Sequence, residues 1–139
     1  MFKVTVSKNR VRICLSAELV NVEKVDMETK LFLTDGGFDD IAFGACLVMR
    51  ELVNNSIIHG SKENPRKRIR YCLEKREDGF EMSIEDEGEG FDWEAAMETV
   101  PSLSASHGRG MMILNAYCHD VRFNEKGNRI SVKFVKEPV

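Results

Sequence analysis

The chain of 139 residues is predicted to adopt an α+β fold, a two-layer α/β sandwich of about six mostly antiparallel strands with helices on one face. Three observations predict it. Apolar and polar residues alternate in three pairs of short segments, each pair joined by a turn. Two longer segments between the first and second pairs repeat apolar residues at helical spacing. Strands with one apolar face need cover on that face, which helices packed on a single side supply.

The strand pairs are predicted from alternation around turn sequences. The first pair covers 2–6 and 11–15 around a turn at 7–10, and the last pair covers 121–123 and 130–134 around 125–128. In the middle pair, apolar residues alternate over 69–73 and 80–84, and Asp78-Gly79 joins the two segments. Asp-Gly between alternating segments is a strong hairpin signal.

The first helix is predicted over 17–33, after a potential cap at Ser16 and before the glycines at 36–37. Further helices are expected over 92–98 and 110–118. The intervening 99–110 segment, which contains Ser, Gly and Pro, is expected to be a mobile loop.

The main helix is predicted over 39–59, where one long apolar face runs without Pro and, after Gly44, without Gly. His59 and Gly60 are expected to close it. A cationic or polar residue followed by a Gly that accepts the left-handed conformation is typical of a helix C-terminus. We therefore interpret His59 as a helix-end residue.

Composition indicates one soluble globular domain spanning 1–139. Hydrophobic residues make up 42% and charged residues 31%, and the net charge of −3 disfavours nucleic acid as a partner, although a local basic patch remains possible. The N-terminus lacks the apolar core of a signal peptide, and no run approaches the roughly 18 apolar residues of a membrane span, so a cytoplasmic protein is expected. The four cysteines form no Cys-x-x-Cys pair, which favours reduced core thiols over a zinc or redox site.

The first candidate site element is the pair Glu51 and Asn55 in the main helix. Residues four apart share a helix face, here at the edge of the apolar stripe beside Gly44 and Val48. A partly desolvated Glu could serve as a base, and an amide oxygen is a suitable ligand for Mg²⁺. Alternatively, these polar residues are simply solvated on the outer face of the helix.

The second element is Asp86-Glu87-Gly88-Glu89-Gly90, directly after a predicted strand. Gly88 and Gly90 let the backbone approach a ligand closely, and Asp86 can accept a hydrogen bond from an exocyclic amine. The alternative is an ordinary acidic turn. The carboxylate spacing does not fit a twelve-residue calcium loop.

The third element is Gly108-Arg109-Gly110, which runs into an apolar helix. Free amides at a helix N-terminus attract phosphate, and Arg109 could add a charge-assisted contact. Alternatively, the segment is a flexible connector.

In this order, the three elements resemble the N, G1 and G2 boxes of the GHKL, or Bergerat-fold, ATPases. Within them, the chain is similar to the small anti-sigma-factor serine kinases of bacterial stress and sporulation pathways. The N-box likeness rests on Glu51, Asn55 and the Ile-Ile-His-Gly sequence that ends at Gly60. The resemblance is close over about 38–136 and looser before it.

The resemblance implies a site for ATP and Mg²⁺. Glu51 would orient or deprotonate the attacking hydroxyl, and Asn55 would bind Mg²⁺. Asp86 would read the adenine amine, while Gly88 and Gly90 would shape the base pocket.

The resemblance also implies an ATP lid over about 97–110, with Gly108, Arg109 and Gly110 near the phosphates. One departure is Asn128, which stands where the family often has Thr. Its amide can still donate a hydrogen bond, but its part in the adenine site is left open.

The activity implied is that of an ATP-dependent serine/threonine-protein kinase acting as an anti-sigma factor. Its acceptor would be an anti-anti-sigma protein of the STAS type, and it would alternately sequester a sigma factor. Neither direct nucleic-acid binding nor membrane association is expected, and a homodimer is possible. The alternatives are a non-catalytic, ATP-gated binding module and a detached histidine-kinase catalytic domain.

Overall fold

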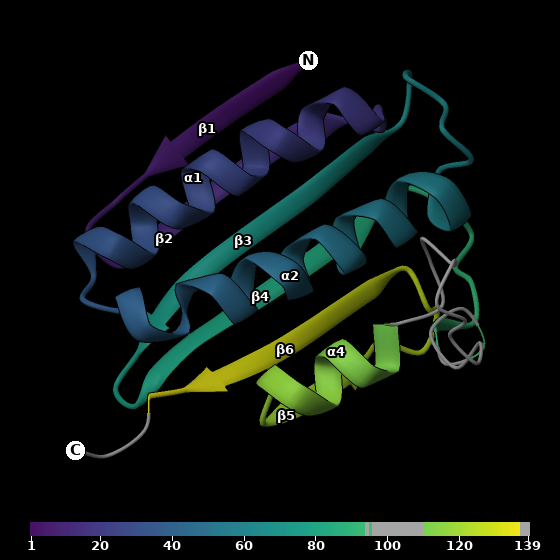
Figure 1. The fold of residues 1–139 in the computed structure, drawn as a ribbon. Helices are drawn as coiled ribbons and strands as arrows, with labels where there is room; N and C mark the ends of the chain where they lie inside the picture. The colour runs from purple at the N-terminus through teal and green to yellow at the C-terminus, as the bar shows by residue number, and fades with distance from the viewer. Residues whose placement is uncertain (94, 96–109, 137–139) are drawn as a thin grey trace, which may run out of the picture.

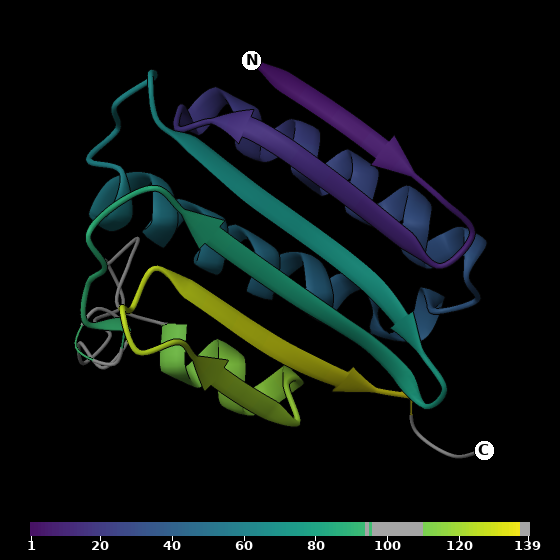
Figure 2. The ribbon, with the colours of Figure 1, turned by 180° about the vertical axis from the view of Figure 1, so that it is seen from behind.

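Six strands form one antiparallel sheet in the computed structural model, which describes residues 1–93, 95 and 110–136. The strand order is β1-β2-β3-β4-β6-β5, and every neighbouring pair is antiparallel. The predicted α+β sandwich is confirmed. The helices of the described residues lie on one face of the sheet (Figure 1), and the opposite face carries no helix (Figure 2). The strands are β1 (Phe2–Val6), β2 (Arg10–Ser16), β3 (Arg68–Arg76), β4 (Gly79–Asp86), β5 (Asp120–Phe123) and β6 (Arg129–Val135).

The strand pleat separates an apolar face from a polar one. In the central strands, Ile13 is paired with Tyr71 and Tyr71 with Ile84, and all three are at most 2% exposed. Because successive residues point to opposite faces, the charged residues between them lie on the other side. The core therefore fills the space between the sheet and the helices.

Helix α1 (Val22–Asp35) begins five residues later than predicted. Ser16 does not cap it, because that residue ends β2, and a 3-10 turn over Leu19–Asn21 comes before the helix. Instead, the buried amide of Asn21 donates to the Ser16 carbonyl and hydroxyl oxygens, at 3.0 Å each. The apolar spacing predicts this helix correctly, but the helix starts later because Ser16 belongs to β2 and Leu19–Asn21 forms the 3-10 turn.

Helix α1 is fixed to the sheet and to the next helix by polar contacts. The buried Thr29 and Tyr71 hydroxyls lie 2.7 Å apart, and burial raises the pKa of Tyr71. Arg50 of α2 (Asp39–Asn55) makes a bidentate pair with Glu23, at 2.8 and 3.0 Å, and approaches the buried Asp26 at 3.4 Å. These contacts hold the middle of α2 against α1.

Helix α2 (Asp39–Asn55) continues as one π-helical turn, η2 (Ser56–Gly60). The Ser61 amide donates to the Ser56 carbonyl at 2.9 Å, which is the five-residue spacing of a π turn. The prediction that Gly60 ends the helix in a left-handed conformation is wrong, since the positive-φ glycines of the described residues are Gly37, Gly90 and Gly127.

Helix α4 (Gly110–Tyr117) packs beside α2. A Cβ added at Gly44 of α2 would lie 2.8 Å from Cγ of the Tyr117 ring, so this glycine permits the close approach. The predicted helix over 110–118 is confirmed to within one residue. Of the helix predicted over 92–98, Trp93 and Ala95 are helical, whereas 94 and 96–98 lie outside the described residues, as does 99–109.

The helical segment Asp39–Gly60 is long and apolar enough to cross a membrane, with a mean hydropathy of 1.3 over its most apolar window. The sequence had indicated no such segment. Because 56% of that window is buried inside this fold, we interpret it as the central core helix.

Candidate functional site

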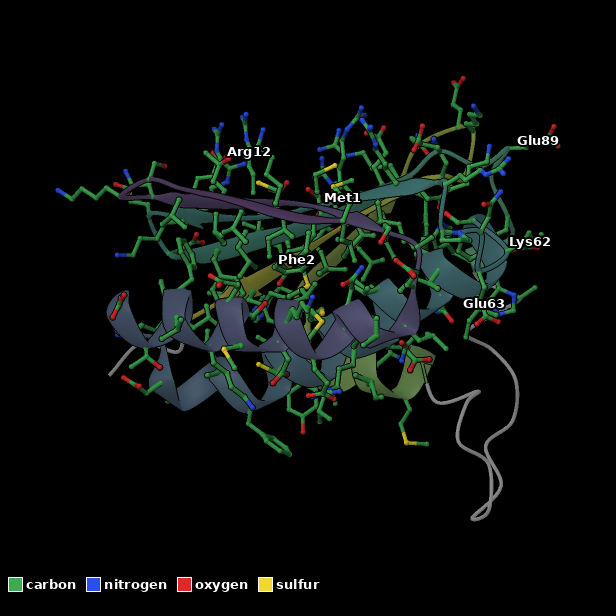
Figure 3. The ribbon with its side chains drawn as sticks, turned by 90° about the horizontal axis from the view of Figure 1, so that it is seen from above. Met1, Phe2, Arg12, Lys62, Glu63 and Glu89 are labelled. Carbon is green, nitrogen blue, oxygen red and sulfur yellow. The ribbon has the colours of Figure 1, made fainter. Side chains whose placement is uncertain are left out.

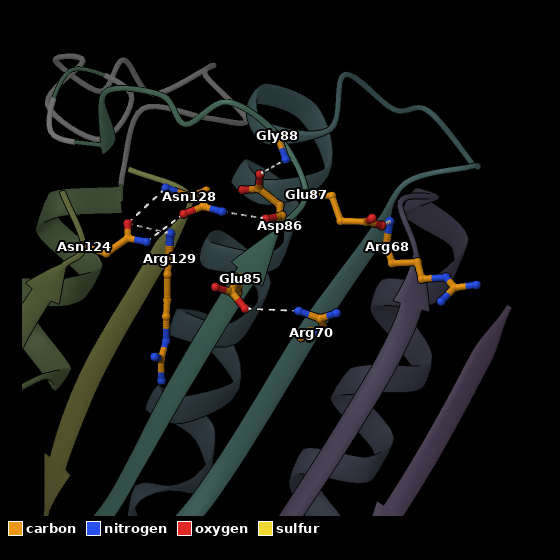
Figure 4. Close-up of polar contacts among 9 residues, drawn as sticks. All are labelled: Arg68, Arg70, Glu85, Asp86, Glu87, Gly88, Asn124, Asn128 and Arg129. Carbon is orange, nitrogen blue, oxygen red and sulfur yellow. Dashed lines mark hydrogen bonds and ion pairs between the residues drawn. The ribbon is translucent and has the colours of Figure 1, made fainter. Parts of the chain in front are cut away.

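The end of α2 and the end of β4 meet at one edge of the sandwich, where Asp86 is 2% exposed. Its Oδ1 accepts a hydrogen bond from the Gly88 amide at 2.7 Å (Figure 4). Its Oδ2 is buried and has no hydrogen-bond partner among the described residues. A buried acceptor left unpaired is costly, so a donor from a ligand would stabilise it.

Burial raises the pKa of the Asp86 carboxyl above its usual value of 3.8. The hydrogen bond from the Gly88 amide acts in the opposite direction, and the neighbouring Glu85 charge adds to the increase. Desolvation is the largest contribution, because it disfavours the charged form.

Two glycines pack directly against this carboxylate. A Cβ at Gly60 would overlap Asp86 Oδ2 and lie 2.9 Å from Oδ1. A Cβ at Gly88 would overlap the Gly60 carbonyl and lie 2.8 Å from Asp86 Oδ1. A glycine is therefore required at position 60 because any side chain there would overlap Asp86. The sequence analysis had instead attributed Gly60 to a left-handed backbone conformation.

Gly90 serves the loop in another way. Its φ is +96°, which favours glycine, and a Cβ there would overlap the Lys126 carbonyl. The loop after β4 is thereby held against the turn between β5 and β6. Gly90 shapes this loop without lying against the Asp86 carboxylate.

Further buried polar atoms lie in and beside the π turn. Asn55 is 8% exposed, and its Nδ2 has no hydrogen-bond partner among the described residues. Ser56 and Ser61 are 0% and 3% exposed, and their hydroxyls likewise have no partner within the described part of the chain. The alternative of a solvated Asn55 is wrong. Glu51, one turn before Asn55, is half-buried.

Asn128 holds the backbone of Asp86. Its Nδ2 donates to the Asp86 carbonyl at 2.9 Å, and the Asp86 amide donates to the Asn128 carbonyl at 2.9 Å (Figure 4). The Asn128 Oδ1 accepts from Asn124 at 2.7 Å. Asn128 is therefore engaged in positioning the end of β4, which gives a structural reason for an amide at this position.

Aromatic residues extend from the π turn along the loop after β4. The His59 and Phe91 rings lie 5.7 Å apart and the Phe91 and Trp93 rings 4.3 Å apart, between centroids. Trp93 Nε1 donates to the Gly127 carbonyl at 3.0 Å. His59 is exposed in the last helical turn, in agreement with its interpretation as a helix-end residue.

The third predicted element is described only at its end. Gly110 is the first residue of α4, whereas Gly108, Arg109 and the rest of the expected lid over 97–109 lie outside the described residues. The structure therefore brings the π turn that follows Asn55 against Asp86 and Gly88, through Gly60.

The sequence interpretation did not single out the buried hydroxyls of Ser56 and Ser61, and it misread Gly60. A signal was available for the two serines, because they flank the Ile-Ile-His-Gly sequence already assigned to the site. The proximity of Gly60 to Asp86 had no local signal. It depends on how α2 and β4 pack.

No group of three or more His, Cys, Asp or Glu side chains is placed to hold a metal ion among residues 1–93, 95 and 110–136. These residues therefore do not form a metal site built mainly from protein carboxylates. Mg²⁺ usually keeps several waters and combines one or two protein ligands with substrate phosphates, so one amide at the site is compatible with it.

Known proteins similar to this chain include ATPases and kinases. A family model described as a histidine kinase-like ATPase domain matches residues 15–134. The serine-protein kinase RsbW of Staphylococcus epidermidis is 26% identical over 137 residues, covering 91% of this chain and 86% of its own length. The anti-sigma F factor of Heyndrickxia coagulans is 30% identical over 137 residues, covering 91% of this chain and 92% of its own. The chain belongs to the histidine kinase-like ATPase domain family, as its sequence motifs had indicated.

Proposed function

We propose that this chain is an ATP-dependent protein serine/threonine kinase that acts as an anti-sigma factor in a partner-switching system. Its substrate would be a serine or threonine of a STAS-type anti-anti-sigma protein, and its second partner a sigma factor. The names of the relatives, a serine-protein kinase and an anti-sigma factor, support this function. We also propose that 1–139 forms one domain and acts in the cytoplasm.

The observation that carries the proposal is the buried Asp86 Oδ2, which has no hydrogen-bond partner among the described residues. An adenine amine would supply the donor this atom lacks, since a carboxylate is an acceptor only. Gly60 and Gly88 lie against this carboxylate, and the lack of a side chain at either position lets it keep its place. Gly90 would shape the wall of the same pocket through the turn it contacts.

The phosphate end of the nucleotide would lie toward Asn55. When bound, Mg²⁺–ATP supplies the phosphoryl group and neutralises its charge. Asn55 would hold the metal through its amide, and the residues Gly108, Arg109 and Gly110 would bind the phosphates with backbone amides and one guanidinium.

Glu51 is proposed as the catalytic residue. It lies one helical turn before Asn55, so its carboxylate would act beside the metal. There it would orient the acceptor hydroxyl and could take its proton. Phosphoryl transfer needs mainly positioning and charge stabilisation, which one carboxylate, one metal ligand and backbone amides can supply.

Phosphate transfer to a partner tests the proposal directly. We expect the purified protein, incubated with labelled ATP and Mg²⁺, to phosphorylate a serine or threonine of a STAS-type protein. ATP binding without transfer to any identified partner would instead favour a non-catalytic, ATP-gated module. Transfer to a histidine protein would favour a detached histidine-kinase domain.

Asn55→Ala is expected to lower Mg²⁺-supported ATP affinity by roughly ten-fold, because the amide that serves the metal is lost. The variant should remain folded, since Ala is the better helix former and the removed Nδ2 is unpaired among the described residues. Calorimetric titration with and without Mg²⁺ measures the effect. Asn54→Ala, one residue away and half-buried, is the matched control. Unchanged affinity together with a lower Tm would assign Asn55 a structural role.

Gly60→Ala is expected to displace the Asp86 carboxylate, because the added Cβ would overlap it. We expect a loss of ATP affinity of at least ten-fold and a fall of about 1–3 kcal/mol in the free energy of unfolding. Titration with ATP and thermal unfolding measure the two effects. Gly36→Ala is the control, since Gly36 has a negative φ and its Cβ would approach the Lys75 side chain and the Phe38 ring at 3.1 Å, in a different part of the fold from Asp86. Intact ATP binding by Gly60→Ala would contradict the placement of the adenine pocket.

A further inference from the structure

The face of the sheet opposite the helices is hollowed to a volume of about 600 Å³. Its floor consists of short side chains, Thr5, Cys14, Cys72 and Ser83, from four adjacent strands. Long charged side chains surround them, and Figure 3 shows Arg12 projecting from this face, away from the helix layer. The volume falls within the roughly 300–1,000 Å³ of sites that enclose a bound group.

The charge of the hollow is opposite to that of the chain. Its charged lining has three more cationic than acidic side chains, whereas the whole chain has a net charge of −3. A solvated face of an antiparallel sheet is ordinarily polar, so polarity alone would indicate nothing. The excess of cationic over acidic side chains, in contrast, indicates a negatively charged ligand. The charged lining residues are Lys3, Arg10, Arg12, Arg70, Arg76, Arg129, Glu74, Glu81 and Glu85.

Internal ion pairs engage all three glutamates of the hollow. Glu74 contacts Arg10 at 2.8 Å and Arg76 at 2.6 Å. Glu81 contacts Arg76 at 3.3 Å, and Glu85 contacts Arg70 at 3.4 Å (Figure 4).

Three cations of the hollow, Lys3, Arg12 and Arg129, make no ion pair within the described part of the chain. They come from β1, β2 and the start of β6, so they border the hollow from both sides. All three are exposed.

We propose that this hollow binds an acidic segment of a partner protein, whose carboxylates pair with Lys3, Arg12 and Arg129. Arg in particular binds a carboxylate through two parallel hydrogen bonds. The partner's occasional basic residue would meet Glu74, Glu81 or Glu85. The proposal does not rest on the proposed kinase activity.

The pattern of charges favours a protein over the other polyanions. A nucleic-acid strand carries a negative charge at every step and would bring phosphates against the three glutamates. A second copy of this chain, facing the hollow with its own hollow, would bring two positive surfaces together. A protein segment can alternate its charges to match the mixed lining.

The hollow and the nucleotide site lie on opposite sides of the sheet. Glu85 lines the hollow, and Asp86, the next residue of β4, points to the helix side. A segment in the hollow would therefore leave the Asp86 pocket open. The two ligands can be tested separately.

Binding is tested with a fluorescein-labelled peptide of about a dozen residues that repeats Glu-Glu-Lys. We expect the affinity, measured by fluorescence anisotropy at low salt, to fall at least ten-fold in Arg12→Glu/Arg129→Glu. The matched control is Lys8→Glu/Lys24→Glu, which makes the same change in net charge at exposed positions outside the hollow. Equal losses in the two variants, or no binding by the wild type, would overturn the proposal.

The floor cysteines locate the peptide on the unmodified protein. We expect the bound peptide to slow iodoacetamide labelling of Cys14 and Cys72 at least three-fold, measured by mass spectrometry, and to leave Cys118 unchanged. Unprotected Cys14 and Cys72 would place the peptide elsewhere and overturn the proposal. Tighter binding of an oligothymidylate of equal charge, or self-association that Arg12→Glu/Arg129→Glu abolishes, would replace the acidic segment with nucleic acid or a second copy.

Discussion

Glu51→Gln is expected to bind ATP as the wild type does and to phosphorylate a partner serine at least about 10²-fold more slowly. The substitution keeps the size and shape of the side chain but removes the negative charge proposed to orient the acceptor hydroxyl and to take its proton. A lost acid–base contribution is typically of this size. Single-turnover phosphate transfer and nucleotide titration, measured on the same preparations, separate chemistry from binding.

The control for Glu51→Gln is Glu89→Gln, an exposed carboxylate in the loop that follows Asp86. It should change neither ATP binding nor transfer appreciably. If wild-type protein transfers phosphate and Glu51→Gln is equally fast, the kinase proposal stands and the assigned role of Glu51 does not. If both proteins bind ATP and neither transfers phosphate, the ATP-gated module replaces the kinase.

Asp86→Asn is expected to weaken ATP binding by about 10- to 100-fold, because the carboxylate that would accept a hydrogen bond from the adenine amine is lost. The same change should stabilise the free protein at pH 7. The Asp86 carboxylate of the wild type is buried, and its Oδ2 has no hydrogen-bond partner among the described residues. Burial raises the pKa of this carboxyl above 3.8. A variant with lower affinity and higher Tm would separate a binding role from a structural one.

The pH dependence follows from the raised pKa of Asp86. In the wild type, the cost of burying the charge is absent below the carboxyl's unfolded pKa and complete above its raised folded pKa. The Tm advantage of Asp86→Asn, roughly 1–3 °C at pH 7, should therefore shrink as the pH falls toward 3. Thermal unfolding without nucleotide over pH 3–7 measures it.

Asp78→Asn is the matched control, because Asp78 is exposed in the turn before the other end of β4. Its Tm difference from the wild type should be small at neutral pH. An Asp86→Asn protein that is less stable than the wild type at pH 7 would show that the carboxylate is satisfied within the protein. The adenine assignment would then lose its main support.

The sequence alone determined the elements whose signals are local. The Asp78-Gly79 turn joins β3 to β4 as predicted, and the helical face of Glu51 and Asn55 lies where its four-residue spacing puts it. Burial of one face imposes a period of two on strands and 3.6 on helices, and this period is visible in a single segment. The three motifs also indicated the family, because their order along the chain can be recognised in the sequence without a structure.

Only the tertiary structure decided which distant residues meet. A Cβ at Gly60 would overlap the Asp86 carboxylate. The side-chain amide of Asn128 donates to the carbonyl of Asp86, 42 positions away along the chain. The contact of Gly60 depends on α2 crossing the end of β4, and that of Asn128 depends on β6 pairing with β4. The cationic hollow likewise requires five strands, β1, β2, β3, β4 and β6, to lie side by side. Strand order and register result from packing the whole core, so no short stretch of sequence specifies these contacts.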